Sequence, residues 1–155
     1  MYQLDKKDRQ ILQILQQDAK ANIKAIAFQV GLSATPVYER IKRLEKKGII
    51  THYAAKIDTD KIGLELLVFC QVSLQKHTKN HIADFENAVS GMPEVQEAYH
   101  IAGDFDYLLK ILVHDSTQYH HFLVEKLSKL DMIANVQSNF VMFKTKESEY
   151  YPLQS

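Results

Sequence analysis

Cationic and small polar residues are concentrated in residues 33–47 of this 155-residue chain. The segment carries five Lys and Arg residues against two glutamates. Cations along a helix can hold the phosphates of a nucleic acid, and small polar residues at the helix N-terminus can reach base edges in a major groove. A solvated helix face has a similar composition, so the charges alone leave both interpretations open.

The histidines and the single cysteine are the other residues with reactive side chains. His77 and His81 have a spacing that can hold a metal on a helix, but His77 is expected to precede the helix and no third ligand is evident. His120 and His121 are adjacent and would point about 100° apart on a helix. Cys70 lies in an apolar run and is expected in the core. We therefore expect no metal site and no cysteine nucleophile.

Composition and charge narrow the class of protein. The chain is 46% apolar and 25% charged, which is typical of a globular protein. A single cysteine excludes an internal disulfide and fits a reducing compartment. No apolar run reaches the ~18 residues of a membrane helix, so we expect a cytoplasmic location. Residues 1–63 have a net charge of +5 and residues 64–155 of −5. Unless this partition is chance, only the first part is expected to meet a polyanion.

The first 48 residues contain three helix patterns. Apolar residues at helical spacing predict a helix over 5–17. Asn22 is a good cap for a second helix, which Gly31 would end in a left-handed conformation. Ser33 then caps a third helix over 33–47, with Pro36 in its first turn. Two helices joined by a short glycine-containing turn predict a helix-turn-helix.

The third helix has two faces. Val37, Ile41 and Leu44 are spaced to face inward, whereas Thr35 and Lys42 lie on the opposite side. Residues 49–57 are rich in β-forming side chains and could form a small wing or a linker strand. We expect three parts: a DNA-binding domain over residues 1–50, a wing or linker over 51–63, and a second domain over 64–155.

The remainder of the chain alternates strand and helix patterns in the order βαββαβ. The expected strands and helices, in chain order, are 66–74, 79–90, 95–102, 105–114, 116–130 and 136–145. This order predicts an α+β, ferredoxin-like unit with its helices on one sheet face. The other face, which includes Leu67 and Phe69, would need a partner. Sheet-to-sheet packing in a homodimer is the natural solution.

Two motifs resemble one known family. Residues 32–50 resemble the recognition-helix segment of the Lrp/AsnC (leucine-responsive, feast/famine) regulators. Residues 103–110, Gly-Asp-Phe-Asp-Tyr-Leu-Leu-Lys, resemble the segment that defines their amino-acid-sensing RAM domain. The resemblance spans about residues 2–150 in the expected order. It implies a winged helix-turn-helix domain followed by a ferredoxin-like RAM domain.

The resemblance also implies partners and DNA contacts. Family members form homodimers that often assemble into octamers, and they bind pseudo-palindromic double-stranded DNA through paired recognition helices. The small polar residues, the proline and the tyrosine would contact base edges or the groove, and the cations would make phosphate or mixed contacts. The residues that match the family's DNA-contact positions are Ser33, Thr35, Pro36, Tyr38, Arg40, Lys42, Arg43 and Lys46.

The family's amino-acid effector would bind near the hairpin that joins the expected strands 95–102 and 105–114, and near the start of the last strand. Its carboxylate needs donors and its ammonium group needs acceptors. Met132-Ile133 replaces the family's common Gly-Val turn, and Val136 and Ser138 stand where two hydroxyl residues are common. The candidate contacts are His100, Ile101, Ala102, Gly103, Asp104, Asp106, Met132, Ile133, Ala134, Val136 and Ser138.

These patterns predict a transcriptional regulator, with leucine or methionine as the expected effector and no other cofactor. An enzyme resembling siroheme decarboxylases, which share the fold and use histidines, is an alternative. The basic helix argues against it, because such an enzyme does not need one. A third hypothesis is an architectural protein that bends DNA without sensing a ligand.

Overall fold

The computed structural model describes residues 2–148 and 150–153 and divides the chain into two compact units. One unit comprises residues 57–144, and the other combines the chain up to Lys56 with the described residues from Thr145 onward. The C-terminal segment was expected to continue the second domain, but its contacts group it with the first unit.

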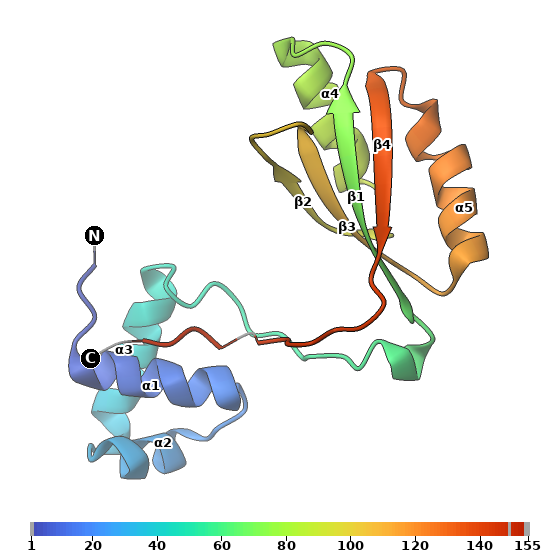
Figure 1. The fold of residues 1–155 in the computed structure, drawn as a ribbon. Coiled ribbons are helices and arrows are strands. Elements are labelled where there is room, and N and C mark those ends of the chain that lie inside the picture. Colours follow the sequence, from blue (N-terminus) through green and yellow to red (C-terminus); the bar gives the residue numbers. More distant parts are fainter. Residues whose placement is uncertain (1, 149, 154–155) are drawn as a thin grey trace. The chain divides into compact units, whose positions relative to one another are not determined.

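The helical unit contains α1 (Lys6–Gln17), α2 (Ile23–Val30) and α3 (Ala34–Lys46), all labelled in Figure 1. Asp5 caps α1 by accepting a hydrogen bond from the Asp8 N–H, and the Asp8 carboxylate reaches back to the Asp5 N–H. Asn22 caps α2, and Gly31 ends it at a φ of 66°, as the sequence predicted. One face of each helix is buried in a common core. The fully or nearly buried members are Ile11, Ile26, Ala27, Val30, Val37 and Ile41.

No strand forms in residues 49–57, all of which lie within the described chain. The expectation of a wing or linker strand was therefore wrong. The β-forming side chains of this segment have no neighbouring strand to supply hydrogen bonds, and the tertiary context decides the conformation. The segment is tied to α3 at its start, where Ile49 and Ile50 donate to the Leu44 carbonyl, and by the Tyr53 hydroxyl, which donates to Glu45.

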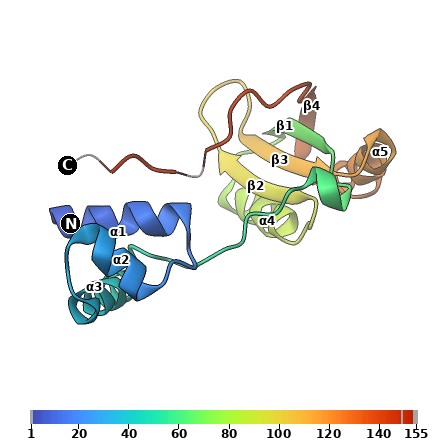
Figure 2. The same cartoon turned by 90° about the horizontal axis from the view of Figure 1, so that it is seen from below.

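The second unit is an antiparallel sheet with helices on one face (Figures 1 and 2). Along the chain it runs β1 (Leu66–Leu74), α4 (Lys79–Ser90), β2 (Val95–His100), β3 (Tyr107–Val113), α5 (Ser116–Glu125) and β4 (Ile133–Phe140). The sheet order is β2-β3-β1-β4. Alternate residues of β1 and β3 are buried against α4 and α5, which confirms the predicted βαββαβ fold.

Several element ends differ from the sequence prediction: β2 ends at His100 instead of 102, β3 covers Tyr107–Val113 instead of 105–114, and β4 ends at Phe140 instead of 145. The second helix was expected to run to 130, but α5 ends at Glu125 and a 3₁₀ turn over Leu127–Lys129 follows, with Leu127 buried. The last strand was expected over 136–145 but lies three residues earlier at its start. Its register explains this, because Ile133 pairs with Leu74 and Phe140 with Val68, near the two ends of β1.

The opposite sheet face carries a half-buried apolar patch. Leu67 and Phe69 of β1 lie beside Leu112 and Lys110 of β3. Lys110 forms an ion pair with Glu97 at 2.6 Å. The patch is therefore apolar with an ion pair beside it, and Leu67 and Phe69 lie on the face without helices, as the sequence predicted.

The C-terminal segment is held by the side-chain amide of Gln16 on α1. The Tyr151 N–H donates to Gln16 Oε1 at 2.7 Å, and Gln16 Nε2 donates to the Tyr151 carbonyl at 3.3 Å. Gln13 donates more weakly to the Leu153 carbonyl. No helix in the described part of the chain is long and apolar enough to cross a membrane.

Candidate nucleic-acid interface and effector site

Helix α3 is positioned by the turn that follows α2. The Leu32 N–H donates to the Ala27 carbonyl at 3.0 Å, which closes the turn behind Gly31. Val37, Ile41 and Leu44 are buried and fix the rotation of α3 about its axis. Ser33 occupies the N-cap position, as predicted, but its hydroxyl accepts no cap hydrogen bond.

The face of α3 opposite its buried residues presents most of the side chains predicted to contact DNA. Tyr38 is about half exposed, at 49%. Pro36 and Arg40 are partly buried. The exposed members of the predicted set are Ser33, Thr35, Tyr38, Lys42, Arg43 and Lys46. The sequence-derived helix geometry is thus confirmed, and the contacts themselves stay a prediction.

Lys42 has local partners on this surface. Its ammonium lies 2.8 Å from a Glu45 carboxylate oxygen and 5.8 Å from the centre of the Tyr38 ring. The hydrogen bond from Lys42 lowers the pKa of Glu45 and raises that of Lys42. Tyr53 donates a second hydrogen bond to Glu45. Because the pair is exposed to solvent, a nucleic-acid phosphate can compete for Lys42.

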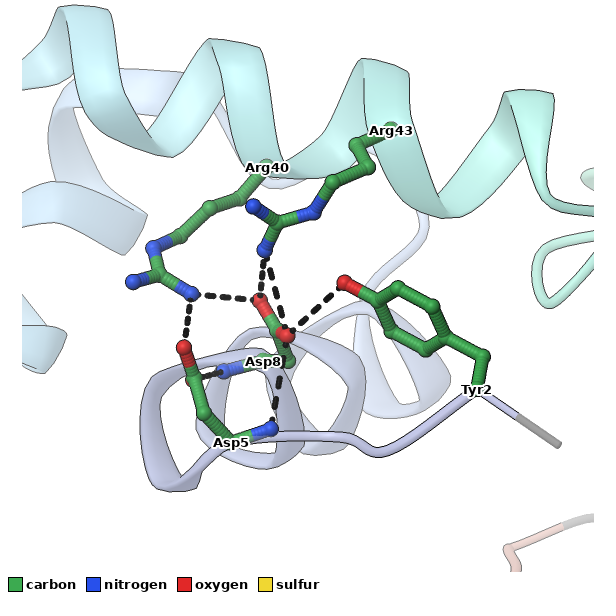
Figure 3. Close-up of polar contacts among 5 residues, drawn as sticks. All are labelled: Tyr2, Asp5, Asp8, Arg40 and Arg43. Carbon is green, nitrogen blue, oxygen red and sulfur yellow. Dashed lines mark hydrogen bonds and ion pairs between the residues drawn. The ribbon is translucent and has the colours of Figure 1, made fainter.

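The two arginines of α3 converge on a buried carboxylate of α1 (Figure 3). Asp8 is 1% exposed. Its Oδ1 accepts from Arg40 Nη1 at 2.6 Å and from Arg43 Nη2 at 2.9 Å. Arg40 Nη1 also donates to Asp5 Oδ2 at 2.5 Å. A buried carboxylate requires such charged donors, since burial without them is costly.

Arg40 and Arg43 make different contacts in this cluster. The hydrogen bond from Arg40 to Asp5 raises the pKa of Arg40, and that of Asp5 is lowered mainly by the Asp8 N–H. Arg40 is 23% exposed and binds both carboxylates, whereas Arg43 is 44% exposed and binds only Asp8. Arg40 is therefore already engaged within the chain, which weakens its assignment to phosphate contacts.

Asp8 and Tyr2 were not among the site residues predicted from the sequence, although Asp8 falls in the apolar pattern of the first helix. Tyr2 donates to Asp8 Oδ2 at 3.4 Å, and its ring centre lies 5.9 Å from the Arg43 guanidinium carbon. Asp8 occupies a core-facing position of α1, one turn before Ile11 and Leu12. A charged residue at such a position is the available signal, because it needs partners from another element.

The predicted effector residues of the hairpin gather at one end of the sheet. His100 ends β2 and stacks on Tyr107, with ring centres 4.8 Å apart. The Ile101 N–H donates to the Asp106 carbonyl at 2.8 Å and closes the loop. Ala102, Gly103 and Asp104 form its exposed tip, where Gly103 has a φ of 146°.

The Asp106 carboxylate is engaged by its own unit. Its Oδ2 accepts from the Leu74 N–H at 2.7 Å, and Oδ1 lies 2.7 Å from His77 Nε2. The Leu74 N–H is the main cause of the lowered pKa of Asp106, and His77 adds to it. Asp106 thus has a structural role at the end of β1, whatever part it takes in ligand binding.

The start of β4 reaches the same end of the sheet, because Ile133 pairs with Leu74 and the Gln75 N–H donates to the Met132 carbonyl at 2.8 Å. Ala134 is exposed there. Met132, Ile133 and Val136 pack against the core. Ser138 lies farther along β4 and shares a hydrogen bond of 2.6 Å with the buried Tyr119 hydroxyl. The hairpin and residues 132–134 therefore lie at the same end of the sheet, with the end of β1 between them. Ser138 is turned to the core, and Met132, Ile133 and Val136 are partly buried against it.

His77, His81 and Cys70 make contacts within the fold. His77 contacts Asp106, and His81 shares a hydrogen bond with the Thr78 hydroxyl at the start of α4. Within residues 2–148 and 150–153, no three His, Cys, Asp or Glu side chains are grouped to hold a metal ion. Cys70 is fully buried, and burial raises the pKa of its thiol to about 11. Cys70 is therefore a core residue, as predicted, and it is present as the unreactive thiol at neutral pH.

Comparison with known proteins agrees with both halves of this description. Residues 4–51 match the family model "Winged helix-turn-helix DNA-binding", and residues 67–151 match "Lrp/AsnC ligand binding domain". The chain is 36% identical to the DNA-binding transcriptional activator DecR of Escherichia coli K12, over 97% of this chain and 99% of that protein. It is 37% identical to the leucine-responsive regulatory protein of the same strain, over 94% of this chain and 88% of that protein.

Solved structures share the whole fold. A transcriptional regulator of Neisseria meningitidis, solved as a complex with L-Met, superimposes with a TM-score of 0.93 at 33% identity. The match covers 97% of each chain. An AsnC-family transcriptional regulator of Agrobacterium tumefaciens gives a TM-score of 0.91 at 36% identity, over 96% of this chain and 97% of that one.

Proposed function

The chain belongs to the Lrp/AsnC family of DNA-binding transcriptional regulators, and we propose that it reads double-stranded DNA with α3 and responds to a small amino acid through its sheet unit. The observation that carries the proposal is the two-sided structure of α3. Val37, Ile41 and Leu44 anchor one face in the core, and the other face exposes polar and cationic side chains. This is the arrangement that a helix needs to enter a major groove.

The proposed DNA-bound form is at least a homodimer. The half-buried patch of Leu67, Phe69 and Leu112 supports it, since a second sheet would remove this apolar surface from water. The patch would pack on its own copy about a twofold axis. A twofold dimer presents two α3 helices and therefore reads two inverted half-sites. Assembly of such dimers into an octamer is part of the proposal.

The proposed effector is a small apolar amino acid, leucine or methionine. The neisserial relative was solved with L-Met, which supports this class of ligand. Here the ligand would bind at the end of the sheet that carries the hairpin tip and residues 132–134. Asp104 is exposed at that tip and is the candidate acceptor for the ammonium group, because the Asp106 carboxylate already has two partners. Ile133 and Met132 would line the side-chain pocket.

The deciding experiment is selection of duplex DNA on the purified full-length protein at a fixed salt concentration of ~0.15 M. An inverted repeat among the enriched sequences is expected, and its half-site spacing reports the separation of the paired helices. Salt-sensitive binding without a motif would replace the proposal with the architectural hypothesis. Absence of DNA binding would overturn it and make tetrapyrrole binding, the enzyme alternative, the next assay.

The selected site then allows a test of the effector. Binding is measured with each of the twenty amino acids, and leucine or methionine is expected to change the affinity or the assembly state. By linkage, the ligand can act only through different affinities for the two states. Asp104→Ala is expected to retain DNA binding and to lose the response. A normal ligand titration with this variant would remove Asp104 from the site.

A further inference from the structure

We propose that Asp8 is a positioning residue for a sequence-specific DNA contact of Arg43. This inference rests on the proposed DNA-binding function. Asp8 lies on α1, is 1% exposed and does not itself reach the surface of α3. Its carboxylate binds one terminal nitrogen of Arg43, Nη2, at 2.9 and 3.2 Å. Figure 3 shows one nitrogen of this guanidinium bound to Asp8, with the Tyr2 hydroxyl on the same carboxylate.

The remaining edge of Arg43 is what makes the arrangement useful. Within the described residues, Nη2 is the nitrogen of Arg43 that contacts a carboxylate. A guanidinium has five N–H donors in a rigid, planar fork, so fixing Nη2 also fixes the direction of the other donors. The Arg43 side chain is 44% exposed, so it is accessible to a ligand. A fork held in one orientation suits the bidentate contact of arginine with guanine.

Arg40 has a different role in the cluster, which is to compensate the charge of the carboxylates. Its Nη1 lies between the two carboxylates, at 2.5 Å from Asp5 and 2.6 Å from Asp8, and its side chain is half as exposed as that of Arg43. Arg40 therefore supplies the second positive charge that the buried carboxylate requires. With Arg40 in place, Asp8 can hold Arg43 by a single nitrogen without remaining an uncompensated charge.

The test compares Asp8→Asn with Asp5→Asn in the full-length protein. Asparagine keeps an oxygen for the Asp5 N–H and removes the charge that fixes Arg43. The measured quantity is the ratio of affinities for the selected site and a scrambled duplex. Asp8→Asn is expected to lower this ratio about tenfold, since a bidentate base contact contributes that much discrimination. Its salt dependence should steepen by about one phosphate, because the released arginine can bind the backbone.

Asp5→Asn is the matched control, because it removes a charge from the same cluster without touching Arg43. It is expected to keep the discrimination ratio. If Asp8 is only structural, Asp8→Asn will lower the unfolding temperature and leave the discrimination of the folded protein unchanged. That outcome would overturn the inference, and so would an equal loss in both variants.

Arg43→Lys keeps the test decisive if Asp8→Asn fails to fold. Lysine retains the charge but has no fork, so this variant should reproduce the loss of discrimination without the change in salt dependence. Where both variants fold, the double variant should discriminate no worse than either single one, because both remove the same contact. Additive losses of discrimination would mean that Asp8 and Arg43 act independently, which would overturn the inference. A wild-type selection without any motif would instead reject the proposed function, independently of Asp8.

Discussion

The helical unit and the sheet unit bury polar groups in different ways. In the helical unit, a carboxylate that is 1% exposed is held by two arginines from another helix. In the sheet unit, the described residues that are buried are apolar or neutral, as is Tyr119, whose hydroxyl shares a hydrogen bond with Ser138. The Glu94 carboxylate of this unit is 13% exposed and pairs with one lysine, Lys126. The smaller core of the helical unit is thus supplemented by directional contacts between α1 and α3.

This difference has a functional consequence. The arginines that compensate Asp8 lie on the helix proposed to read DNA, so stability and recognition share the same side chains. In the sheet unit, the core under β1 and the exposed hairpin tip at Ala102–Asp104 use separate residues. Substitutions at the hairpin tip should therefore affect ligand binding alone, whereas substitutions in the Asp8 cluster should affect stability and recognition together.

Phe85→Ala is expected to have the largest effect. Phe85 of α4 is fully buried, and its ring lies 4.6 Å from that of Tyr107. Removing a buried phenyl ring costs about 4 kcal/mol of unfolding free energy. Urea unfolding followed by amide exchange should show this loss in the sheet unit, with α1–α3 still protected. Loss of protection in α1–α3 as well would mean that the two units do not unfold separately.

Asp8→Ala is expected to lower the unfolding free energy of the helical unit by about 3 kcal/mol. This value is at the low end for breaking a buried ion pair, because both arginines are partly exposed. The substitution also removes half of the capping box of α1. The unfolding midpoint by circular dichroism measures the change. Asp18→Ala is the control, since Asp18 is an exposed acid at the other end of α1 and should change little. Equal midpoints for the two variants would contradict a stabilising role for the Asp8 cluster.

Local signals in the sequence predicted the fold well. Asn22 and Gly31 carried cap information that depends on a few neighbouring residues, and the structure agrees with both. The strand pattern over 66–74 likewise predicted the bounds of β1. The wing strand over 49–57 failed because a strand needs a partner, and partner strands are not encoded in the segment itself.

The site was harder to predict than the fold. The exposed face of α3 follows from helical spacing alone, so Thr35 and Lys42 were found correctly on the surface. The pairing of Arg43 with Asp8 joins residues 35 positions apart and depends on the packing of α1 against α3. Ser138 faces the core because the register of β4 aligns it with Cys70. Such registers are set by the whole sheet and not by the strand's own sequence.

Asp106→Asn offers a pH test of the sheet unit. The pKa of Asp106 is lowered chiefly by the Leu74 N–H, so the folded state favours the ionised carboxyl. The carboxylate therefore stabilises the fold above its ordinary pKa, and this contribution is lost as the pH falls through the lowered value. The variant should be less stable by about 1 kcal/mol at pH 7 and match the wild type in strong acid. Urea midpoints measured from pH 7 downward would reveal a constant difference if the charge played no part.

Gln16→Ala should have the smallest effect on stability, yet it tests the contact between α1 and the C-terminal segment. The Gln16 amide binds both main-chain groups of Tyr151 at an exposed position, so its loss should change the unfolding free energy by only about 0.5 kcal/mol. Amide exchange at Tyr151 should nevertheless accelerate severalfold, because its N–H loses its acceptor. Gln17→Ala is the control, since Gln17 makes no hydrogen bond to Tyr151 within the part of the chain that the structure describes. If exchange at Tyr151 were the same in both variants, Gln16 would not be what holds the C-terminal segment to α1.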